Sequence, residues 1–381
     1  MDRKARVIAL YLPQYYPIKE NDDFWGKGFT EWRNVAKARP LFKGHYQPRI
    51  PADLGFYDLR LSETRIEQAK MAENYGIEGF CYWHYWFGNG KMVLQSVLEE
   101  VLKSGEPDFP FCVGWANHSW SNKTWEKTGR FKTTVVFLNQ TYPGNEDYIN
   151  HFMYLLPFFK DPRYITVDGK PLFMIFNPYE IPDNKHLIEL WNQLAVQNGL
   201  PGIYFVARCE SATPKFSREE VIKGVETRKR FDYWIEQGYD AIYSVPVEAL
   251  KIICQGDRRY RFENLTKRFH INTAVEKYDY RKMLPYTYGN EDYREDVFPQ
   301  IMPHWDNTPR QGKNGYVYIN ESPENFGKQI DLALQHVQNK QFDHKIIFAH
   351  SWNEWGEGAY LEPDMKYGLH YLDQIAKKVL Y

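Results

Sequence analysis

The feature of this sequence that most constrains its fold is a regular alternation of strand-like and helix-like segments. Short runs of apolar, β-branched or aromatic residues recur along the chain, and stretches with a helical apolar period separate them. Eight of these runs are predicted to be strands: Arg6–Leu12, Ile77–Trp83, Phe109–Trp115, Lys170–Phe176, Gly202–Ala207, Tyr239–Val245, Val297–Met302 and Lys345–Ala349.

Helices are predicted between these strands and after the last one. Their ranges are Leu59–Tyr75, Met92–Lys103, Tyr148–Phe158, Leu187–Gln197, Ser217–Val225, Tyr278–Tyr288, Asn325–Val337 and Gly368–Val379. Eight strand–helix units within 381 residues favour a closed parallel barrel over an open doubly wound sheet. An open nucleotide-binding sheet usually carries a glycine-rich turn after its first strand, and here that position holds Leu12-Pro13-Gln14-Tyr15-Tyr16-Pro17.

The sequence therefore predicts an α/β fold, a (β/α)8 TIM barrel with elaborated loops after its strands. No linker, repeat or low-complexity segment divides the chain, so residues 1–381 are expected to form one domain.

Charge and hydropathy narrow the choice of partners. Lys and Arg number 48 against 49 Asp and Glu, so the net charge of −1 gives no global field to attract nucleic acid or an anionic membrane. No apolar run is long enough for a transmembrane helix. The charged N-terminus lacks the apolar stretch of a signal peptide, which predicts a cytoplasmic location. Cys81, Cys112, Cys209 and Cys254 lie in or beside apolar runs and are expected to be free thiols.

Aromatic residues are the unusual part of the composition. With 29 Tyr, 24 Phe and 12 Trp they make up 17% of the chain. The C–H faces of sugar rings stack on aromatic rings, so an aromatic-rich chain is compatible with an oligo- or polysaccharide partner. A large aromatic core would account for the same composition.

Polar and aromatic side chains follow several predicted strands, at the barrel end where chemistry is carried out in this architecture. The segments are Tyr82-Trp83-His84-Tyr85-Trp86, Trp115-Ala116-Asn117-His118-Ser119-Trp120, Arg208 with Glu210, His304-Trp305-Asp306 and the segment from His350 to Gly358. Residues predicted to contact a sugar by stacking or hydrogen bonding are Tyr11, Tyr82, Trp83, His84, Trp115, Asn117, His304, Trp305, Asn353 and Trp355. Structural packing is the alternative for each of them.

Glu354 and Glu357 are the predicted catalytic pair. Cleaving a glycosidic bond needs a proton donor for the leaving oxygen and a second group that manages charge on the other side. Two neighbouring carboxylates can supply both, because their repulsion separates their pKa values. Both glutamates lie in a loop rich in Trp and Gly directly after the last strand. The alternative is that they are solvent-facing loop residues.

The segment Trp352-Asn353-Glu354-Trp355-Gly356-Glu357-Gly358, followed by Leu361-Glu362-Pro363, resembles the strand-eight motif of glycoside hydrolase family 99, the endo-α-1,2-mannosidases and mannanases. Nearly the whole chain resembles the related WbsX family, which is labelled a glycosyltransferase family and associated with bacterial surface polysaccharides. The residues of that resemblance include Ala9–Pro17, Gly28-Phe29-Thr30-Glu31-Trp32, Gly79–Trp86 and Trp115-Ala116-Asn117.

The resemblance to family 99 implies roles for the two glutamates. Glu357 would be the general acid/base, and Glu354 would take the proton of the sugar 2-hydroxyl, whose oxygen displaces the leaving group to give a 1,2-anhydro intermediate. No cofactor or metal is implied. The family 99 motif has a histidine at the position of Gly356, and this departure is expected to reshape the sugar subsite.

Four readings stay open at this stage. The first is a retaining endo-acting glycoside hydrolase, and the second a glycosyltransferase of O-antigen or capsule synthesis, although an Asp-x-Asp motif is missing. The third is a metal-dependent hydrolase using His84, His118, His304 and His350, whose spacing fits no common metal motif. The fourth is a catalytically silent sugar-binding module.

A basic stretch follows the sixth predicted strand. Residues 255–268 carry Arg258, Arg259, Arg261, Lys267 and Arg268, interleaved with Tyr260 and Phe262. A solvated insertion is the ordinary interpretation. The alternative hypothesis is that it faces an anionic substrate group.

Overall fold

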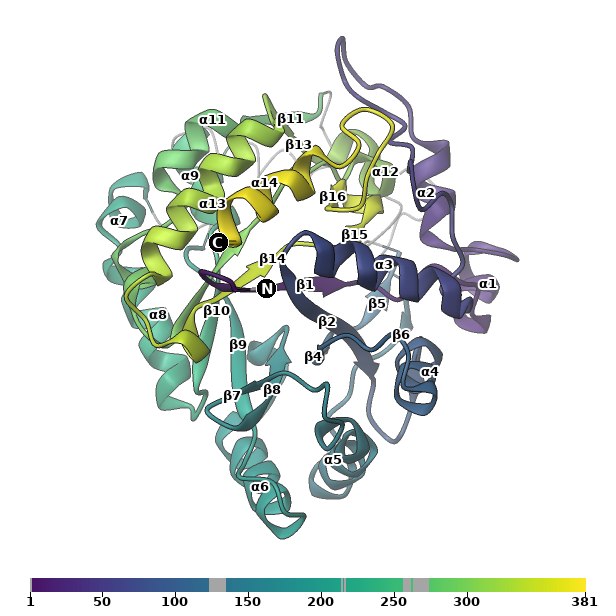
Figure 1. The fold of residues 1–381 in the computed structure, drawn as a ribbon, viewed down its shortest axis with the longest axis vertical. Helices are drawn as coiled ribbons and strands as arrows, with labels where there is room; N and C mark the ends of the chain where they lie inside the picture. The colour runs from purple at the N-terminus through teal and green to yellow at the C-terminus, as the bar shows by residue number, and fades with distance from the viewer. Residues whose placement is uncertain (1, 123–134, 214, 216, 256–261, 263–273) are drawn as a thin grey trace.

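The chain is described here from a computed structural model, which describes residues 2–122, 135–213, 215, 217–255, 262 and 274–381. Its centre is a closed barrel of parallel strands (Figure 1). In chain order they are β1 (Arg6–Tyr11), β2 (Ile77–Trp86), β4 (Phe111–Trp115), β8 (Lys170–Ile175), β9 (Tyr204–Glu210), β10 (Ala241–Val245), β12 (Val297–Ile301) and β14 (Ile346–Ala349). Each pairs with its neighbour in parallel, and pairing of β1 with both β14 and β2 closes the ring.

The predicted (β/α)8 barrel is confirmed, and each predicted strand overlaps an observed one. Burial on both faces explains why these strands could be recognised. All six residues of β1 and all four of β14 are buried, since the barrel interior covers one face and helices cover the other. Such strands read as continuous apolar runs rather than as alternating ones.

Helices surround the barrel as an outer ring (Figure 1). They are α3 (Ser62–Asn74), α4 (Ser96–Ser104), α5 (Asn145–Phe159), α6 (Asn184–Gln197), α7 (Arg218–Lys223), α8 (Val225–Glu236), α9 (Val247–Gln255), α13 (Pro323–Val337) and α14 (His370–Val379). Serine or aspartate side chains cap several of them; Ser322, for example, accepts a hydrogen bond from the backbone N–H of Asn325 at the start of α13.

Two helix predictions need correction. The helix predicted over Tyr278–Tyr288 is instead the end of strand β11 (Glu276–Asp279), the short helix α11 (Tyr280–Met283) and the 3-10 turn η2 (Leu284–Tyr286), while α9 is the helix that follows β10. The prediction over Ser217–Val225 covers α7 but misses the longer α8. In α8 only Phe231 and Trp234 are buried, so its sequence carries too little apolar period to show a helix.

Smaller elements elaborate the loops. They are α1 (Lys19–Trp25), α2 (Glu31–Lys37), β3 (Met92–Val93), β5 (Trp120–Ser121), β6 (Val136–Leu138), β7 (Thr166–Val167), η1 (Pro178–Glu180), η3 (Asn290–Tyr293), α12 (Thr308–Gln311), η4 (Gly312–Asn314), β13 (Tyr316–Ile319), η5 (Phe342–His344), β15 (Asn353–Glu354), η6 (Trp355–Glu357) and β16 (Ala359–Tyr360). Three of them, α2, α12 and η6, pack against one another although they follow the first, seventh and eighth barrel strands. This junction is where the paired glutamates lie.

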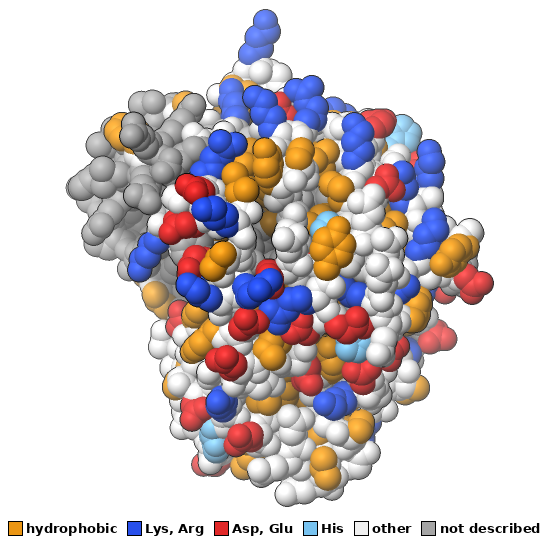
Figure 2. Space-filling model, turned by 90° about the vertical axis from the view of Figure 1, so that its left-hand side faces the viewer, with side chains coloured by type: hydrophobic (Ala, Val, Ile, Leu, Met, Phe, Trp, Pro, Cys, Tyr) orange, Lys and Arg blue, Asp and Glu red, His pale blue; other side chains and the backbone are white. Residues whose placement is uncertain are grey.

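The distribution of charge on the surface and the length of the helices are relevant to the predicted partners. Positive and negative side chains are interspersed over the face shown in Figure 2. Within the described ranges, no helix is both long and apolar enough to cross a membrane.

Candidate active site

Glu354 and Glu357 lie in the loop that follows β14, on a tight turn built from β15, η6 and β16. The Ser351 hydroxyl fastens this turn, since its Oγ donates to the carbonyl of Ala359 at 2.6 Å and accepts from the backbone N–H of Glu354 at 2.8 Å. Gly358 has a φ of +54°, and a Cβ there would lie 2.8 Å from the Cβ of Asp306. The turn therefore requires glycine for both conformation and space.

Asn353 ties this turn to the end of the first strand. Its side-chain oxygen accepts from the backbone N–H of Leu12 at 2.7 Å, and its side-chain nitrogen donates to the Leu12 carbonyl at 3.0 Å. Trp355 anchors the other side, because its ring stacks on Tyr360 with centroids 3.7 Å apart and its N–H donates to Glu362 at 2.6 Å. The backbone that carries the glutamates is thus fixed on both sides.

Arg310 of α12 binds three carboxylates at once. Its Nη1 lies 2.6 Å from Oε1 of Glu357, its Nη2 lies 2.9 Å from Oε2 of Glu354, and its Nε lies 2.8 Å from Oε1 of Glu31. The arginine and the Glu31 carboxylate are buried, and the side chain of Glu357 is the most open of the four at 24% exposure. One cation therefore contacts three carboxyl groups in a largely buried site.

This arrangement changes the protonation of Glu354. Burial raises the pKa of the Glu354 carboxyl to about 8; the nearby guanidinium of Arg310 opposes the rise, and the negative charges of Glu357 and Glu31 add to it. Because Glu354 and Glu357 interact, the proton belongs to the pair. Below a pH of about 8 the pair holds at least one proton, which is what a site needs when one carboxyl must donate.

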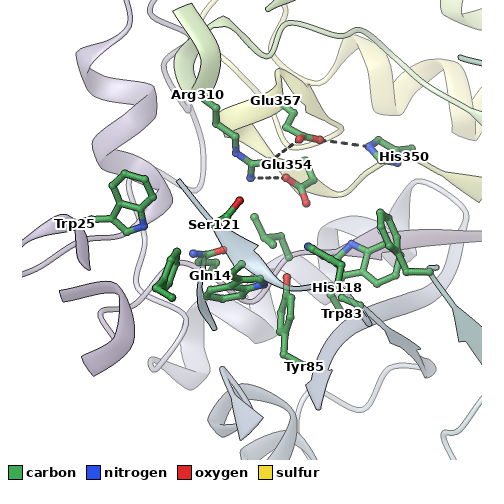
Figure 3. Close-up of a pocket in the computed structure, with 15 residues that line it drawn as sticks. Gln14, Trp25, Trp83, Tyr85, His118, Ser121, Arg310, His350, Glu354 and Glu357 are labelled. Carbon is green, nitrogen blue, oxygen red and sulfur yellow. Dashed lines mark hydrogen bonds and ion pairs between the residues drawn. The ribbon is translucent and has the colours of Figure 1, made fainter. Parts of the chain in front are cut away.

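The two glutamates open onto a cavity of about 140 Å³ at the carboxyl ends of the barrel strands. Six Trp, Tyr and Phe side chains line it: Trp25, Trp83, Tyr85, Trp120, Phe137 and Phe176. Figure 3 shows Arg310, Glu354, Glu357 and His350 on one side, with Gln14, Trp83, Tyr85 and His118 facing them. A flat, apolar partner with a few hydroxyl groups fits such a wall.

Two histidines and a glutamine bring unpaired polar atoms to this cavity. Nε2 of His350, Nδ1 of His118 and Nε2 of Gln14 are buried and have no hydrogen-bond partner. Nε2 of His350 lies 4.0 Å from Oε2 of Glu357, the contact drawn in Figure 3. Burial, with the positive charge of Arg208, lowers the pKa of His350 to about 3 and that of His118 to about 4, so both imidazoles are neutral near pH 7. Neutral imidazoles can donate to or accept from hydroxyl groups.

Three of the predicted site residues line this cavity, namely Trp83, Glu354 and Glu357. The other predicted residues are absent from its lining and are bonded elsewhere. Tyr11 donates to Gln68 of α3 at 2.7 Å, and its ring packs against Tyr82 with centroids 4.5 Å apart. The Nε2 atoms of His84 and His151 lie 3.0 Å apart, on the side of β2 that faces α5.

The remaining predicted residues also have structural contacts. Trp115 donates to the carbonyl of Trp86 at 2.9 Å, and the side-chain nitrogen of Asn117 donates to the Asn177 carbonyl at 2.8 Å. His304 binds the carbonyl of Gly358, and Trp305 stacks on Tyr316 with centroids 5.3 Å apart. Asn353 and Trp355 anchor the catalytic turn, as described above. These residues support the site or pack beside it, and their contact with a sugar stays a prediction.

Several site residues were not predicted from the sequence. Glu31 and Gln14 lie inside the aromatic-rich motifs without a predicted role, whereas Tyr85 and Trp120 belong to strand-end segments predicted to lie at the catalytic end of the barrel. Arg310 follows Trp305-Asp306-Asn307-Thr308-Pro309, and its distance from the predicted strand end hid it. A charged residue four positions beyond a polar strand end is a signal that could have been used.

The histidines proposed as metal ligands are scattered. His84 and His304 are bonded away from the cavity, and only His118 and His350 line it. In the part of the chain that the structure describes, no group of three or more His, Cys, Asp or Glu side chains could hold a metal ion. All four cysteines are free. The basic residues of the stretch 255–268 lie outside the described residues.

Two known structures have a similar fold. A glycoside hydrolase-like protein has a TM-score of 0.59 at 13% identity, with 99% of this chain and 94% of that chain covered. The family 99 endo-α-mannosidase of Bacteroides thetaiotaomicron has a TM-score of 0.50 at 15% identity, with 98% and 96% covered. At these identities the likeness supports the barrel fold.

Closer relatives are found by sequence. Two proteins of Xanthomonas campestris pv. campestris, each named uncharacterized protein WxcX, are 32% identical over 372 and 370 residues, which is 97% of this chain in both cases. The chain spans about half, 49%, of their length. Residues 7–375 match the model of the family described as Glycosyltransferase WbsX. The chain therefore belongs to the WbsX glycosyltransferase family.

Proposed function

We propose that this chain is a carbohydrate-active enzyme, a retaining endo-acting glycoside hydrolase that cleaves an α-linked polysaccharide of mannan-like or bacterial-surface type. The observation that carries the proposal is the sharing of Arg310 by Glu354 and Glu357 on the wall of an aromatic-lined cavity. A binding module needs no such pair. The fold it shares with glycoside hydrolases and the strand-eight motif support the same conclusion.

In the first step, Glu354 takes the proton of the sugar 2-hydroxyl, and that oxygen forms a bond to C1. The bond from C1 to the leaving oxygen breaks, and Glu357 gives its proton to that oxygen. In the second step, Glu357 takes a proton from water, the water oxygen bonds to C1, and the bond between O2 and C1 breaks. O2 then recovers its proton from Glu354, so C1 is inverted twice and its configuration is retained.

Arg310 supports this scheme because it touches both carboxylates. The reaction needs one proton on the pair, located on Glu357 when the leaving group departs. Moving that proton from Glu354 to Glu357 leaves the total charge next to Arg310 unchanged, so the guanidinium stabilises both arrangements. Glu357 is the more exposed of the two, as befits a group that must reach the leaving oxygen and later water.

The second candidate is a glycosyltransferase of surface-polysaccharide synthesis, favoured by the description of the matching family. The same pair could pass the 1,2-anhydro sugar to an acceptor hydroxyl instead of water. The two candidates differ in what consumes the intermediate, so the products distinguish them.

The experiment is an activity screen on α-mannan and on surface polysaccharides, with wild type beside Glu354→Gln, Glu357→Gln and Glu63→Gln. Glu63 is exposed on α3 and serves as the matched control. Cleavage by wild type and Glu63→Gln, but by neither site variant, is the expected result. Consumption of a nucleotide- or lipid-linked donor without cleavage of any polysaccharide would favour the transferase. Turnover by the folded Glu354→Gln and Glu357→Gln proteins would reject the assignment of the pair.

A further inference from the structure

The third carboxylate on Arg310 belongs to Glu31, the first residue of α2. Its side chain is completely buried, its Oε1 accepts from Nε of Arg310 at 2.8 Å, and its Oε2 has no hydrogen-bond partner. Burying a carboxylate with so few partners costs free energy unless an opposite charge pairs with it. The contact with Arg310 is the ion pair that offsets this cost.

Gly356 provides the space that this carboxylate occupies. A Cβ added at Gly356 would lie 1.6 Å from Oε1 of Glu31 and 2.8 Å from Nε of Arg310. The backbone of Gly356 is outside the left-handed region, so conformation does not require glycine there. Space for the Glu31–Arg310 pair is the remaining reason, and the two residues occupy the position toward which a larger side chain in the motif would point.

We propose that Glu31 is a positioning residue, which holds Arg310 from the side of Gly356 so that its two terminal nitrogens serve Glu354 and Glu357 separately. This inference rests on the proposed function of those two glutamates. A planar guanidinium readily forms two parallel hydrogen bonds to a single carboxylate. With Nε fixed by Glu31, Nη1 and Nη2 each keep a different catalytic partner.

Glu31 also sets the charge around Glu354. The groups that face Glu354 are Arg310 from α12, Glu357 from η6, Glu31 from α2, and the hydroxyls of Tyr15 and Tyr85. Arg310 is the only cation in this set, and Glu31 neutralises part of its effect. Removing the charge of Glu31 while keeping its shape should therefore make the last proton of the pair easier to lose.

The test uses Glu31→Gln, with Glu362→Gln as a matched control. Glu362 is also buried and next to Trp355, but its partners are Trp355, Gln68 and Tyr57 instead of Arg310. Carboxyl carbons of 13C-labelled glutamate are titrated by NMR in the resting full chain, and the Glu354 signal is assigned by its loss in Glu354→Gln. This readout needs no turnover, so it is informative even if the proposed hydrolysis fails.

We expect the Glu354 titration to move to lower pH by about one unit in Glu31→Gln and to stay within about 0.3 unit in Glu362→Gln. An unchanged titration in folded Glu31→Gln would overturn the inference. On a cleavable substrate, kcat should fall by about tenfold or more in Glu31→Ala with a smaller change in KM, because Arg310 loses its support.

A second pair of variants keeps the inference testable if Glu31→Gln does not fold. Gly356→Ala should displace the Glu31 carboxylate. In a protein that already carries Glu31→Ala, the fold loss of kcat caused by Gly356→Ala should be smaller than in wild type by a factor of about three or more. Additive effects of Gly356→Ala and Glu31→Ala would contradict the proposed coupling of the two positions.

Discussion

Nη1 of Arg310 lies 2.6 Å from Oε1 of Glu357, while Nη2 of the same guanidinium contacts Glu354 at 2.9 Å. One cation therefore connects the proposed proton donor, Glu357, with the proposed proton acceptor, Glu354.

Replacing Arg310 by lysine should abolish most activity. The single ammonium of lysine cannot serve three carboxylates in fixed directions, so kcat/KM should fall by about 10²–10³-fold. Arg294→Lys is the matched control, because Arg294 also pairs with three carboxylates, Asp232, Glu291 and Asp296, away from the cavity. Comparable losses in both variants, measured on folded protein, would show that Arg310 has only a structural role.

Activity should decline on the alkaline side as the pH passes about 8. The proposed reaction needs one proton on the glutamate pair, and the pKa of Glu354, raised to about 8 by burial, marks the loss of that proton. Above this pH, kcat/KM should fall about tenfold per pH unit. A profile of kcat/KM from pH 5 to 10 checks this, and a flat profile to pH 10 would contradict the proton assignment.

His350 should affect activity without moving this pH profile. Its Nε2 lines the cavity without a hydrogen-bond partner, 4.0 Å from Oε2 of Glu357, and burial lowers its pKa to about 3, so its removal changes no charge at neutral pH. His350→Ala should lower kcat/KM by about 10–100-fold through the loss of one hydrogen bond to substrate. The alkaline limb should stay in place. His370→Ala, an exposed position on α14, should behave as wild type.

Asn353 should act on stability first. Its side chain makes both hydrogen bonds of the bridge to Leu12, and it is fully buried. Asn353→Ala should lower the free energy of unfolding by about 2 kcal/mol and reduce kcat through loosening of the catalytic turn. Denaturant unfolding beside the exposed Asn339→Ala control measures this. If Asn353→Ala were as stable as wild type and only its KM rose, the structural role would be contradicted and Asn353 would be a substrate contact.

The barrel strands were readable from the sequence because burial on both faces makes them continuous apolar runs, as in β1 and β14. Because these runs are continuous, the sequence does not show which of their side chains face the cavity. In the run Tyr82-Trp83-His84-Tyr85-Trp86 every residue is aromatic, so the alternation of a strand cannot be seen; the structure shows that Trp83 and Tyr85 line the cavity, whereas His84 and Trp86 contact His151.

The glutamate pair was recognisable because it is local in sequence. Its partners were not, because Glu31 and Arg310 are brought to Glu354 by contacts among α2, α12 and η6, which only the closed barrel creates. Helix α8 was missed for a related reason: only two of its side chains are buried, so tertiary context and not periodicity makes it a helix.

The measurement that tests the central claim most directly is the configuration of the first-formed product. Cleavage of an α-linked polysaccharide by wild type is followed by proton NMR before the sugar equilibrates, beside Glu354→Gln and Glu357→Gln. The account predicts an α product from wild type and no product from either variant. A β product, or undiminished cleavage by folded Glu354→Gln, would contradict it.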